Sequence, residues 1–173
     1  MNDVTRDISG NNNNSEMIAK SYKTNYGEFI GIGDNGNLWV EDCDVKELAD
    51  KFGSPLLIIS ESQFRYGYRK FRDAFRRRYQ GEVEVLFANK SNNSLALRHI
   101  MNQEGAGGDC FGVNEMYIAL LAGTNPKTLV LNGSNKQTEE LEMAISNGLC
   151  INIDAMDELD RICLLYTSPS PRD

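Results

Sequence analysis

The chain has 173 residues and a net charge of −7, and 40% of its residues are hydrophobic. This length fits one domain, or one domain with a tail, and the apolar share is large enough for a core. The acidic balance argues against nucleic acid and anionic membranes as partners. No apolar run reaches the roughly 18 residues of a membrane helix. The N-terminus lacks a signal-peptide pattern, so we expect a cytoplasmic protein.

The cysteines and the one histidine argue against a metal site. Cys43, Cys110, Cys150 and Cys163 form no C-x-x-C pair, and His99 is the only histidine. A zinc site is therefore not expected, and no metal is predicted. Isolated cysteines in apolar strands behave as small buried hydrophobic residues in a reducing compartment, so we expect these four to be buried. His99 is expected on a helix surface or at a helix–strand contact.

The N-terminal part divides into two stretches. Residues 1–21 are polar and include the run Asn11–Asn14. They offer too little apolar surface to offset the entropy of ordering, so we predict a disordered leader. Residues 22–60 are predicted to form a separate segment of short strands and one helix.

A glycine-rich stretch in this segment has two readings. Asn35 and Gly36 lie between two apolar runs, which predicts a β-hairpin because both residues accept positive φ. Gly31, Gly33 and Gly36 also match the dinucleotide-binding pattern. That motif must open a helix, whereas Leu38–Val40 reads as a strand, so the hairpin is preferred.

Two helices and a strand follow. Val45–Phe52 has helical spacing between an N-cap at Asp44 and Gly53. Leu56–Ile59 is predicted as a buried strand. A long helix then begins at Ser60 or Glu61. Its aromatic stripe is predicted to be core and consists of Phe64, Tyr68, Phe71 and Phe75.

From Val83 onwards, strands alternate with helices. The predicted strands run from Val83 to Lys90 and over Asp109–Gly112, Thr128–Asn132 and Cys150–Asp154. The predicted helices are Ser94–Gln103, Glu115–Ala122, Thr138–Asn147 and Met156–Ile162. Alternation every 20–25 residues or so predicts βαβ units and a parallel sheet, hence an α/β fold. No phosphate-binding glycine loop follows the first strand, which favours about half of a (β/α)₈ (TIM) barrel over residues 61–162, rather than an open Rossmann-like sheet.

Residues 163–173 break this rhythm in mid-helix. They resemble a sequencing adapter translated in frame, and we expect them to be a non-native tail. A Pro-rich linker is the alternative. The tail begins where the barrel pattern still needs strands, so the chain is expected to be an N-terminal portion of a longer protein, and half a barrel with two open sheet edges is expected to be poorly stable and inactive by itself.

Lys90 is the candidate for chemistry. A lysine at the end of a buried strand is unusual, because lysine is seldom buried without a partner. In parallel α/β folds the carboxyl ends of the strands face the active site. A desolvated lysine there can act as an amine nucleophile. The alternative is a lysine that reaches from the strand end into solvent.

Five segments carry a family resemblance. Phe87–Asn92 resembles the Tyr-Ala-x-Lys-Ala-Asn motif of the decarboxylases that use pyridoxal 5′-phosphate (PLP) and share the alanine-racemase fold (fold type III), the diaminopimelate decarboxylases above all. The other four segments follow the family's order: Gly53–Ile58, Gly107–Cys110, Leu131–Lys136 and Asn152–Leu159. Together they cover about Leu38 to Ile162.

Two departures stand out. Ser91 replaces an alanine, and Phe111–Asn114 replaces a Val-Ser-Gly-Gly type of run, which leaves fine substrate specificity open. The racemase motif Lys-Ala-Asp-Ala-Tyr-Gly is not matched after Lys90, so a racemase is disfavoured.

The resemblance implies specific roles. Lys90 would be the catalytic lysine that binds PLP as a Schiff base. Asp109 would lie beside Lys90 on the same barrel face and orient or support the PLP–Lys90 assembly; an N-cap or a solvated acid is the alternative. Glu115 falls at a family glutamate, although a first-turn acid also favours the helix dipole.

The resemblance also implies a reaction. The parent protein would decarboxylate a diamino acid, with meso-diaminopimelate converted to L-lysine as the preferred case. Its N-terminal β segment would belong to a second, β domain, and its partners would be an amino-acid substrate and a second subunit in a homodimer. The alternatives are a decarboxylase of ornithine, arginine or carboxynorspermidine, a non-catalytic PLP-binding relative, or a nucleotide binder that uses Gly31–Gly36.

Overall fold

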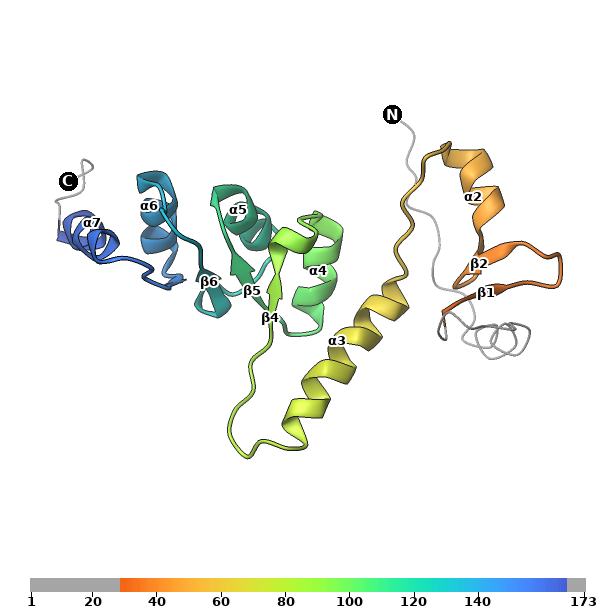
Figure 1. Cartoon of the computed structure of the whole chain (residues 1–173), viewed down its shortest axis with the longest axis horizontal. Coiled ribbons are helices and arrows are strands. Elements are labelled where there is room, and N and C mark those ends of the chain that lie inside the picture. Colours follow the sequence, from red (N-terminus) through yellow and green to blue (C-terminus); the bar gives the residue numbers. More distant parts are fainter. Residues whose placement is uncertain (1–28, 168–173) are drawn as a thin grey trace. The chain divides into compact units, whose positions relative to one another are not determined.

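The computed structural model describes residues 29–167, and these fall into two units that divide between Gly67 and Tyr68. The predicted leader, residues 1–21, and the last six residues of the predicted tail lie outside the described residues. Figure 1 labels most of the helices and strands of both units.

The first unit is a small antiparallel sheet with one helix. Its strands are β1 (Ile30–Ile32), β2 (Leu38–Val40) and β3 (Cys43–Asp44), and its helix is α2 (Val45–Phe52). Ile30 pairs with Val40 and Ile32 with Leu38, and Gly36 takes the left-handed conformation with φ 77°. The predicted hairpin is confirmed. Because the glycine pattern lies in this hairpin and opens no helix, it does not form a dinucleotide-binding loop.

Asp44 joins the hairpin to α2. Its Oδ1 accepts from the Lys46 backbone at 2.8 Å as the N-cap. Its Oδ2 accepts from Asn37 at 2.7 Å and from Asn35 at 3.0 Å. These hydrogen bonds lower the pKa of the Asp44 carboxyl, and the bond from Asn37 has the largest effect. The predicted N-cap is confirmed, and one carboxylate also fixes the hairpin turn.

The strand predicted over Leu56–Ile59 is wrong. These residues form no strand, and the Leu57 side chain is 82% exposed. A strand needs a hydrogen-bonded neighbour, and β1, β2 and β3 pair only with one another. No described segment pairs with Leu56–Ile59, so an apolar run alone does not make a strand.

The second unit repeats a strand followed by a helix. Its strands are β4 (Leu86–Ala88), β5 (Gly107–Cys110), β6 (Leu129–Leu131) and β7 (Cys150–Ile151). Its α-helices are α4 (Leu95–Gln103), α5 (Val113–Leu121), α6 (Thr138–Asn147) and α7 (Met156–Thr167), and its 3₁₀ turns are η1 (Asn89–Ser91) and η2 (Pro126–Thr128). The four strands lie in the order β4-β5-β6-β7 and all pairs are parallel. The predicted α/β class with a parallel sheet is confirmed.

The core lies between this sheet and its helices. Cys110, Leu129 and Leu131 pack from the strands against Met116 of α5 and Leu141 of α6, and all five are fully buried. Figure 1 shows α4 and α5 beside β4 and β5. One face of the sheet is therefore the core, and residues on alternate positions point to the other face.

The predicted burial of the cysteines is correct only for Cys110. Cys43, Cys150 and Cys163 are exposed. Cys150 pairs in register with Val130, on the face opposite the helices, so its strand position brings no burial. The other two lie on exposed positions of β3 and α7.

The aromatic stripe of α3 (Glu61–Arg76) is not core. In the second unit, Phe71 is 55% and Phe75 is 52% exposed, and their rings contact each other at 4.9 Å between centroids. A cavity of about 350 Å³ lies at the end of the helix between Phe75, Tyr79 and Arg78. Periodicity correctly predicts an apolar stripe, but it does not supply an element to cover it.

Strand and helix ends differ from prediction by a few residues. β5 begins at Gly107 instead of Asp109, and α7 continues past Ile162 to Thr167. The α7 helix therefore includes the first five residues of the predicted non-native tail.

Gly107 tests the packing of the sheet. A Cβ atom there would overlap the Thr128 carbonyl oxygen and Leu86 Cδ2. We expect Gly107→Ala to lower the free energy of unfolding by about 1–3 kcal/mol, since the backbone cannot yield as a side chain can. Urea denaturation followed by circular dichroism measures the change.

Gly112→Ala is the matched control. Its added Cβ would meet only Glu140 Oε1, at 3.4 Å, and its φ of −175° suits any residue. Equal stability of the two variants would contradict the close packing of β4 and β5 at Gly107.

Candidate functional site

Lys90 lies at the carboxyl edge of the parallel sheet. β4 ends at Ala88, and the 3₁₀ turn η1 then carries the chain over Asn89–Ser91, with Ser91 Oγ donating to the Ala88 carbonyl at 2.8 Å. This turn takes Lys90 two residues beyond the strand and leaves its side chain exposed. The expectation of a desolvated lysine is therefore wrong, and the alternative of a lysine reaching solvent is the observed one.

The Lys90 amine rests on an aromatic ring. Its Nζ lies 4.0 Å from the centroid of Phe111, a cation–π contact. The backbone N–H of Phe111 donates to Glu115 Oε2 at 2.8 Å, so the first turn of α5 fixes the residue that carries the ring. Sequence reasoning recognised Phe111 as a departure from the family pattern but did not place it under Lys90.

Gly133 makes room for this ring. It has φ 99°, and a Cβ added there would lie 3.2 Å from Phe111 Cδ1. The loop after β6 therefore passes close to Phe111, and glycine suits both the conformation and the contact.

Asp109 lies on the same edge as Lys90 without touching it. It is in register with Ala88 of β4 and Val130 of β6. Its Oδ1 accepts a hydrogen bond from Asn132 Nδ2, and Asn132 Oδ1 accepts one from Asn152 Nδ2. No ion pair joins Asp109 to Lys90, so the sheet brings the two predicted site residues to one edge without pairing them.

The layer beneath the site is polar and buried. Arg98 of α4, 1% exposed, donates to the carbonyls of Ala106 at 2.6 Å and Gly107 at 2.8 Å and to Thr124 Oγ1 at 3.1 Å. Burial lowers the pKa of its guanidinium. These bonds tie α4 to the start of β5 without a carboxylate partner.

Cys110 is not a nucleophile at this site. Burial raises the pKa of its thiol to about 11. Asn89 Nδ2, which lies 3.1 Å from Sγ, lowers the pKa by a smaller amount. A thiol with this pKa is protonated at neutral pH and unreactive. Lys90 is therefore the stronger candidate for covalent chemistry.

A buried ion pair braces the loops that follow β6 and β7. Lys136 and Glu158 are each 1% exposed, and Lys136 Nζ donates to Glu158 Oε2 at 2.9 Å and to the Gly133 carbonyl at 2.6 Å. The backbone N–H of Asp154 donates to Glu158 Oε2 at 3.0 Å. The hydrogen bond from Asp154 has the largest effect on the pKa of the Glu158 carboxyl, and the bond from Lys136 has the second largest. Together they lower this pKa to about 2.

Sequence reasoning placed Lys136 and Glu158 in two motif segments but missed their pairing. The two residues stand 22 positions apart, and a buried pair of this separation has no signal in periodicity. A lysine and a glutamate near the ends of successive βα loops would have been the clue.

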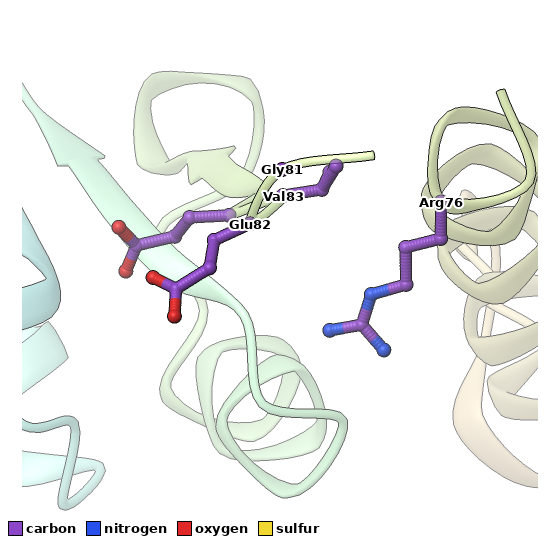
Figure 2. Close-up of a pocket in the computed structure, with 5 residues that line it drawn as sticks. Arg76, Gly81, Glu82 and Val83 are labelled. Atoms are coloured by element: carbon purple, nitrogen blue, oxygen red, sulfur yellow. The ribbon is translucent and has the colours of Figure 1, made fainter. Parts of the chain in front are cut away.

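Other polar groups lie away from this edge. His99 of α4 is exposed and contacts Gln103 at 3.0 Å, so its predicted surface position is confirmed. A cavity of about 620 Å³ lies before β4 begins, at the opposite edge of the sheet, and its lining includes Arg76, Glu82 and Glu84. Figure 2 shows Arg76 and Glu82 on different sides of it. It holds no lysine, and we do not assign the chemistry to it.

Within residues 29–167, no three histidine, cysteine or acidic side chains gather as metal ligands. None of the helices in this range combines the length and the apolar character needed to cross a membrane.

Comparisons with known proteins place this edge in a family. The pyridoxal binding domain of the pyridoxal-dependent decarboxylases matches residues 62–170. The chain is 37% identical to the diaminopimelate decarboxylase of Methanothermobacter thermautotrophicus over 133 residues, which are 77% of this chain and 31% of that protein. It is 36% identical to the enzyme of Methanocaldococcus jannaschii over 129 residues, 72% of this chain and 30% of that one. The chain thus spans about a third of the length of these relatives.

Solved structures agree. The crystal structure of the M. jannaschii diaminopimelate decarboxylase superposes with a TM-score of 0.76 at 34% identity, covering 80% of this chain and 32% of that one. A lysine/ornithine decarboxylase from Vibrio vulnificus, 21% identical with a TM-score of 0.60, covers 68% of this chain and 31% of that one and shares the fold. The expectation of a partial barrel is supported by these superpositions.

Removing one member of the buried ion pair should destabilise the second unit. We expect Glu158→Gln to lower the free energy of unfolding by about 3–5 kcal/mol, because Lys136 is left buried and uncompensated. Asp157→Asn, at the exposed neighbour on α7, should cost within about 0.5 kcal/mol. Urea denaturation of both variants measures this, and equal losses would argue against the pair as a brace.

The pair should also make stability depend on pH. Because folding lowers the pKa of Glu158 from its ordinary 4.5 to about 2, its contribution is complete above the ordinary value and is lost as the pH falls toward about 2. We expect the stability difference between the native chain and Glu158→Gln to shrink from about pH 6 to about pH 3. A difference that stays constant over this range would contradict the lowered pKa.

Proposed function

Because the chain belongs to the family of pyridoxal-dependent decarboxylases through their pyridoxal binding domain, we propose that Lys90 binds PLP covalently and that the protein decarboxylates a diamino acid. The observation that carries this proposal is the position of the Lys90 amine. It is exposed at the carboxyl edge of the sheet, and its nearest contact is an aromatic ring instead of a carboxylate. A lysine without an ion-pair partner has no salt bridge to break, and once it has lost its proton its amine can attack a carbonyl group.

The residues around Lys90 fit this cofactor. Phe111 offers an apolar face beside the amine, and Asp109 offers a carboxylate on the same edge. The thiol of Cys110, the residue after Asp109, is buried and has a raised pKa, so it does not compete as a nucleophile. The polar groups at this edge are thus the amine of Lys90, the carboxylate of Asp109 and the side-chain amides of Asn132 and Asn152.

Each residue has a distinct task in this proposal. When bound, PLP withdraws the electron pair left behind as CO₂ departs. Lys90 would hold the cofactor through its Nζ and would be released from it when the amino group of the substrate binds. Asp109 supports the positive charge of the cofactor–lysine assembly through its carboxylate. Phe111 shields one side of the lysine from water, and Glu115 holds Phe111 in place through its backbone.

We propose meso-diaminopimelate as the substrate and L-lysine as the product. The proposal is supported by two relatives above 35% identity that are diaminopimelate decarboxylases. A structure of the M. jannaschii enzyme in complex with L-lysine adds a ligand of the expected kind. Ornithine, arginine and carboxynorspermidine remain the competing substrates, because Phe111 departs from the family pattern close to Lys90.

We further propose that the protein is cytoplasmic and that the subunits of its full-length parent form a homodimer. Three cysteines with exposed free thiols, Cys43, Cys150 and Cys163, suit a reducing compartment. The dimer rests on the family resemblance. Sedimentation equilibrium of the protein loaded with PLP tests it, and a single monomer mass would contradict it.

Reduction with borohydride tests the cofactor lysine. We expect PLP to be fixed at Lys90 of the full-length protein, because this amine lies over Phe111 at the sheet edge that also carries Asp109. Peptide mapping by mass spectrometry locates the label. Lys90→Arg keeps the charge but should lose the label, whereas the matched change Lys127→Arg, at an exposed lysine of η2, should keep it.

A label spread over the surface lysines, or one that survives Lys90→Arg, would overturn the assignment. Circular dichroism of each variant shows whether the fold is retained.

Protection by amino acids tests the substrate. An amino acid that takes the place of Lys90 on the cofactor should lower the label at Lys90 and appear as a reduced pyridoxyl adduct of its own. We expect meso-diaminopimelate to protect at the lowest concentration among diaminopimelate, ornithine, arginine and carboxynorspermidine. Stronger protection by one of the other three would reassign the substrate. Protection without CO₂ release from the carboxyl-labelled amino acid by the full-length protein would favour a non-catalytic PLP-binding relative.

A further inference from the structure

Three polar side chains form a hydrogen-bonded row along the carboxyl edge of the sheet. Asp109 lies on β5, Asn132 one residue beyond β6, and Asn152 one residue beyond β7. The backbone continues the ladder under them, since Asn132 N–H donates to the Cys110 carbonyl at 2.8 Å and Asn152 N–H to the Leu131 carbonyl at 3.0 Å. The spacing of the row is therefore set by the sheet.

The direction of donation along this row is fixed by its first member. An ionised carboxylate only accepts hydrogen bonds, so Asn132 must turn its NH₂ group toward Asp109. That leaves Asn132 Oδ1 as an acceptor, and Asn152 supplies the donor. Asn132 is therefore held at both ends of its amide group, by Asp109 at the NH₂ group and by Asn152 at the oxygen, and without the NH₂ group of Asn152 only the bond to Asp109 would hold it.

We propose that Asn132 and Asn152 are positioning residues that act as a relay, holding one oxygen of Asp109 so that the other stays available to the cofactor bound at Lys90. The relay rests on the proposed function. Oδ1 is occupied by Asn132, and none of residues 29–167 donates a hydrogen bond to Oδ2. Asn152 therefore acts on the chemistry of Lys90 through Asn132 and Asp109, with no contact of its own to the lysine.

Buried contacts join the two loops that carry the relay. The segment after Asn132 ends at Lys136, and the segment after Asn152 leads to Glu158. The buried Lys136–Glu158 pair joins these two segments at 2.9 Å. Arg161 NH1 adds a bond to the Lys136 carbonyl at 2.6 Å. Both asparagines are thus anchored by the sheet on one side and by a buried ion pair on the other.

Leucine substitutions test whether Asn132 and Asn152 act in series as a relay or independently of each other. Asn132→Leu keeps the approximate shape and removes the donor to Asp109, and we expect the rate of borohydride-fixed labelling at Lys90 to fall about tenfold, the value of a hydrogen bond to a charged group. Asn152→Leu should lower it about threefold. Because Asn152 acts only through Asn132, the double variant should equal Asn132→Leu alone instead of showing the product of the two effects.

Two further variants guard against a trivial loss of structure. Asn152→Gln keeps the NH₂ group on an exposed side chain that has room for the extra methylene, and it should restore labelling to near the native rate. Asn147→Leu makes the same substitution at an exposed asparagine of α6 and should leave the rate unchanged. Failure of Asn152→Gln to restore the rate would overturn the proposal.

Side-chain amide NMR of asparagine-labelled protein gives a readout that does not depend on the cofactor. In Asn152→Leu, the Asn132 amide protons should exchange with solvent several-fold faster, because Asn132 then loses one of the two hydrogen bonds that hold its side chain. If the native chain is not labelled by PLP at Lys90, the proposed function fails. The solvent exchange of the Asn132 amide protons then tests by itself whether Asn152 acts through Asn132. If Lys90 is labelled but Asn152→Leu changes neither the labelling nor the exchange, or if the two leucine effects multiply, the relay is overturned.

Discussion

The parallel ladder from β4 to β7 is the constraint on which the site depends, because it brings four strand ends to one edge. Lys90, Asp109, Asn132 and Asn152 are separated by about 20 residues each along the chain, yet the parallel register brings the ends of their four strands to the same edge of the sheet, with Asp109 two residues short of the level of the other three. Parallel strands need a crossover between each pair, and the helices that form these crossovers also bury the other face. One set of hydrogen bonds therefore builds both the core and the site.

The chemistry of the site follows from which side chains leave the sheet at that edge. The two faces differ: Cys110, Leu129 and Leu131 pack on the helices, whereas Asp109 points to the opposite face. The 3₁₀ turn after β4 lifts Lys90 out of the core and sets it on Phe111. The Lys90 amine is thus exposed, while the loops after β6 and β7 are held by the buried Lys136–Glu158 pair and the start of β5 is held by the buried Arg98.

Much of this arrangement could be predicted from the residues in order. The helices Val45–Phe52 and Thr138–Asn147 were predicted at their observed bounds, since their caps and apolar spacing are local signals. The edge position of Lys90 and Asp109 followed from the alternation of strands and helices. Predictions failed where burial was inferred from apolar character alone. Leu57, Phe71 and Phe75 are exposed because no described element covers them, and burial depends on partners distant in sequence.

The sequence by itself determined the α/β class, the order of the elements, the lysine and carboxylate at successive strand ends, and the family resemblance, because each of these is written in local spacing and composition. Only the tertiary structure decided what these groups touch. The contact of Lys90 with Phe111, the pairing of Lys136 with Glu158 and the row from Asp109 to Asn152 each join residues about 20 positions apart. Such contacts arise when strands pair in register, and no pattern within a single strand or helix specifies them.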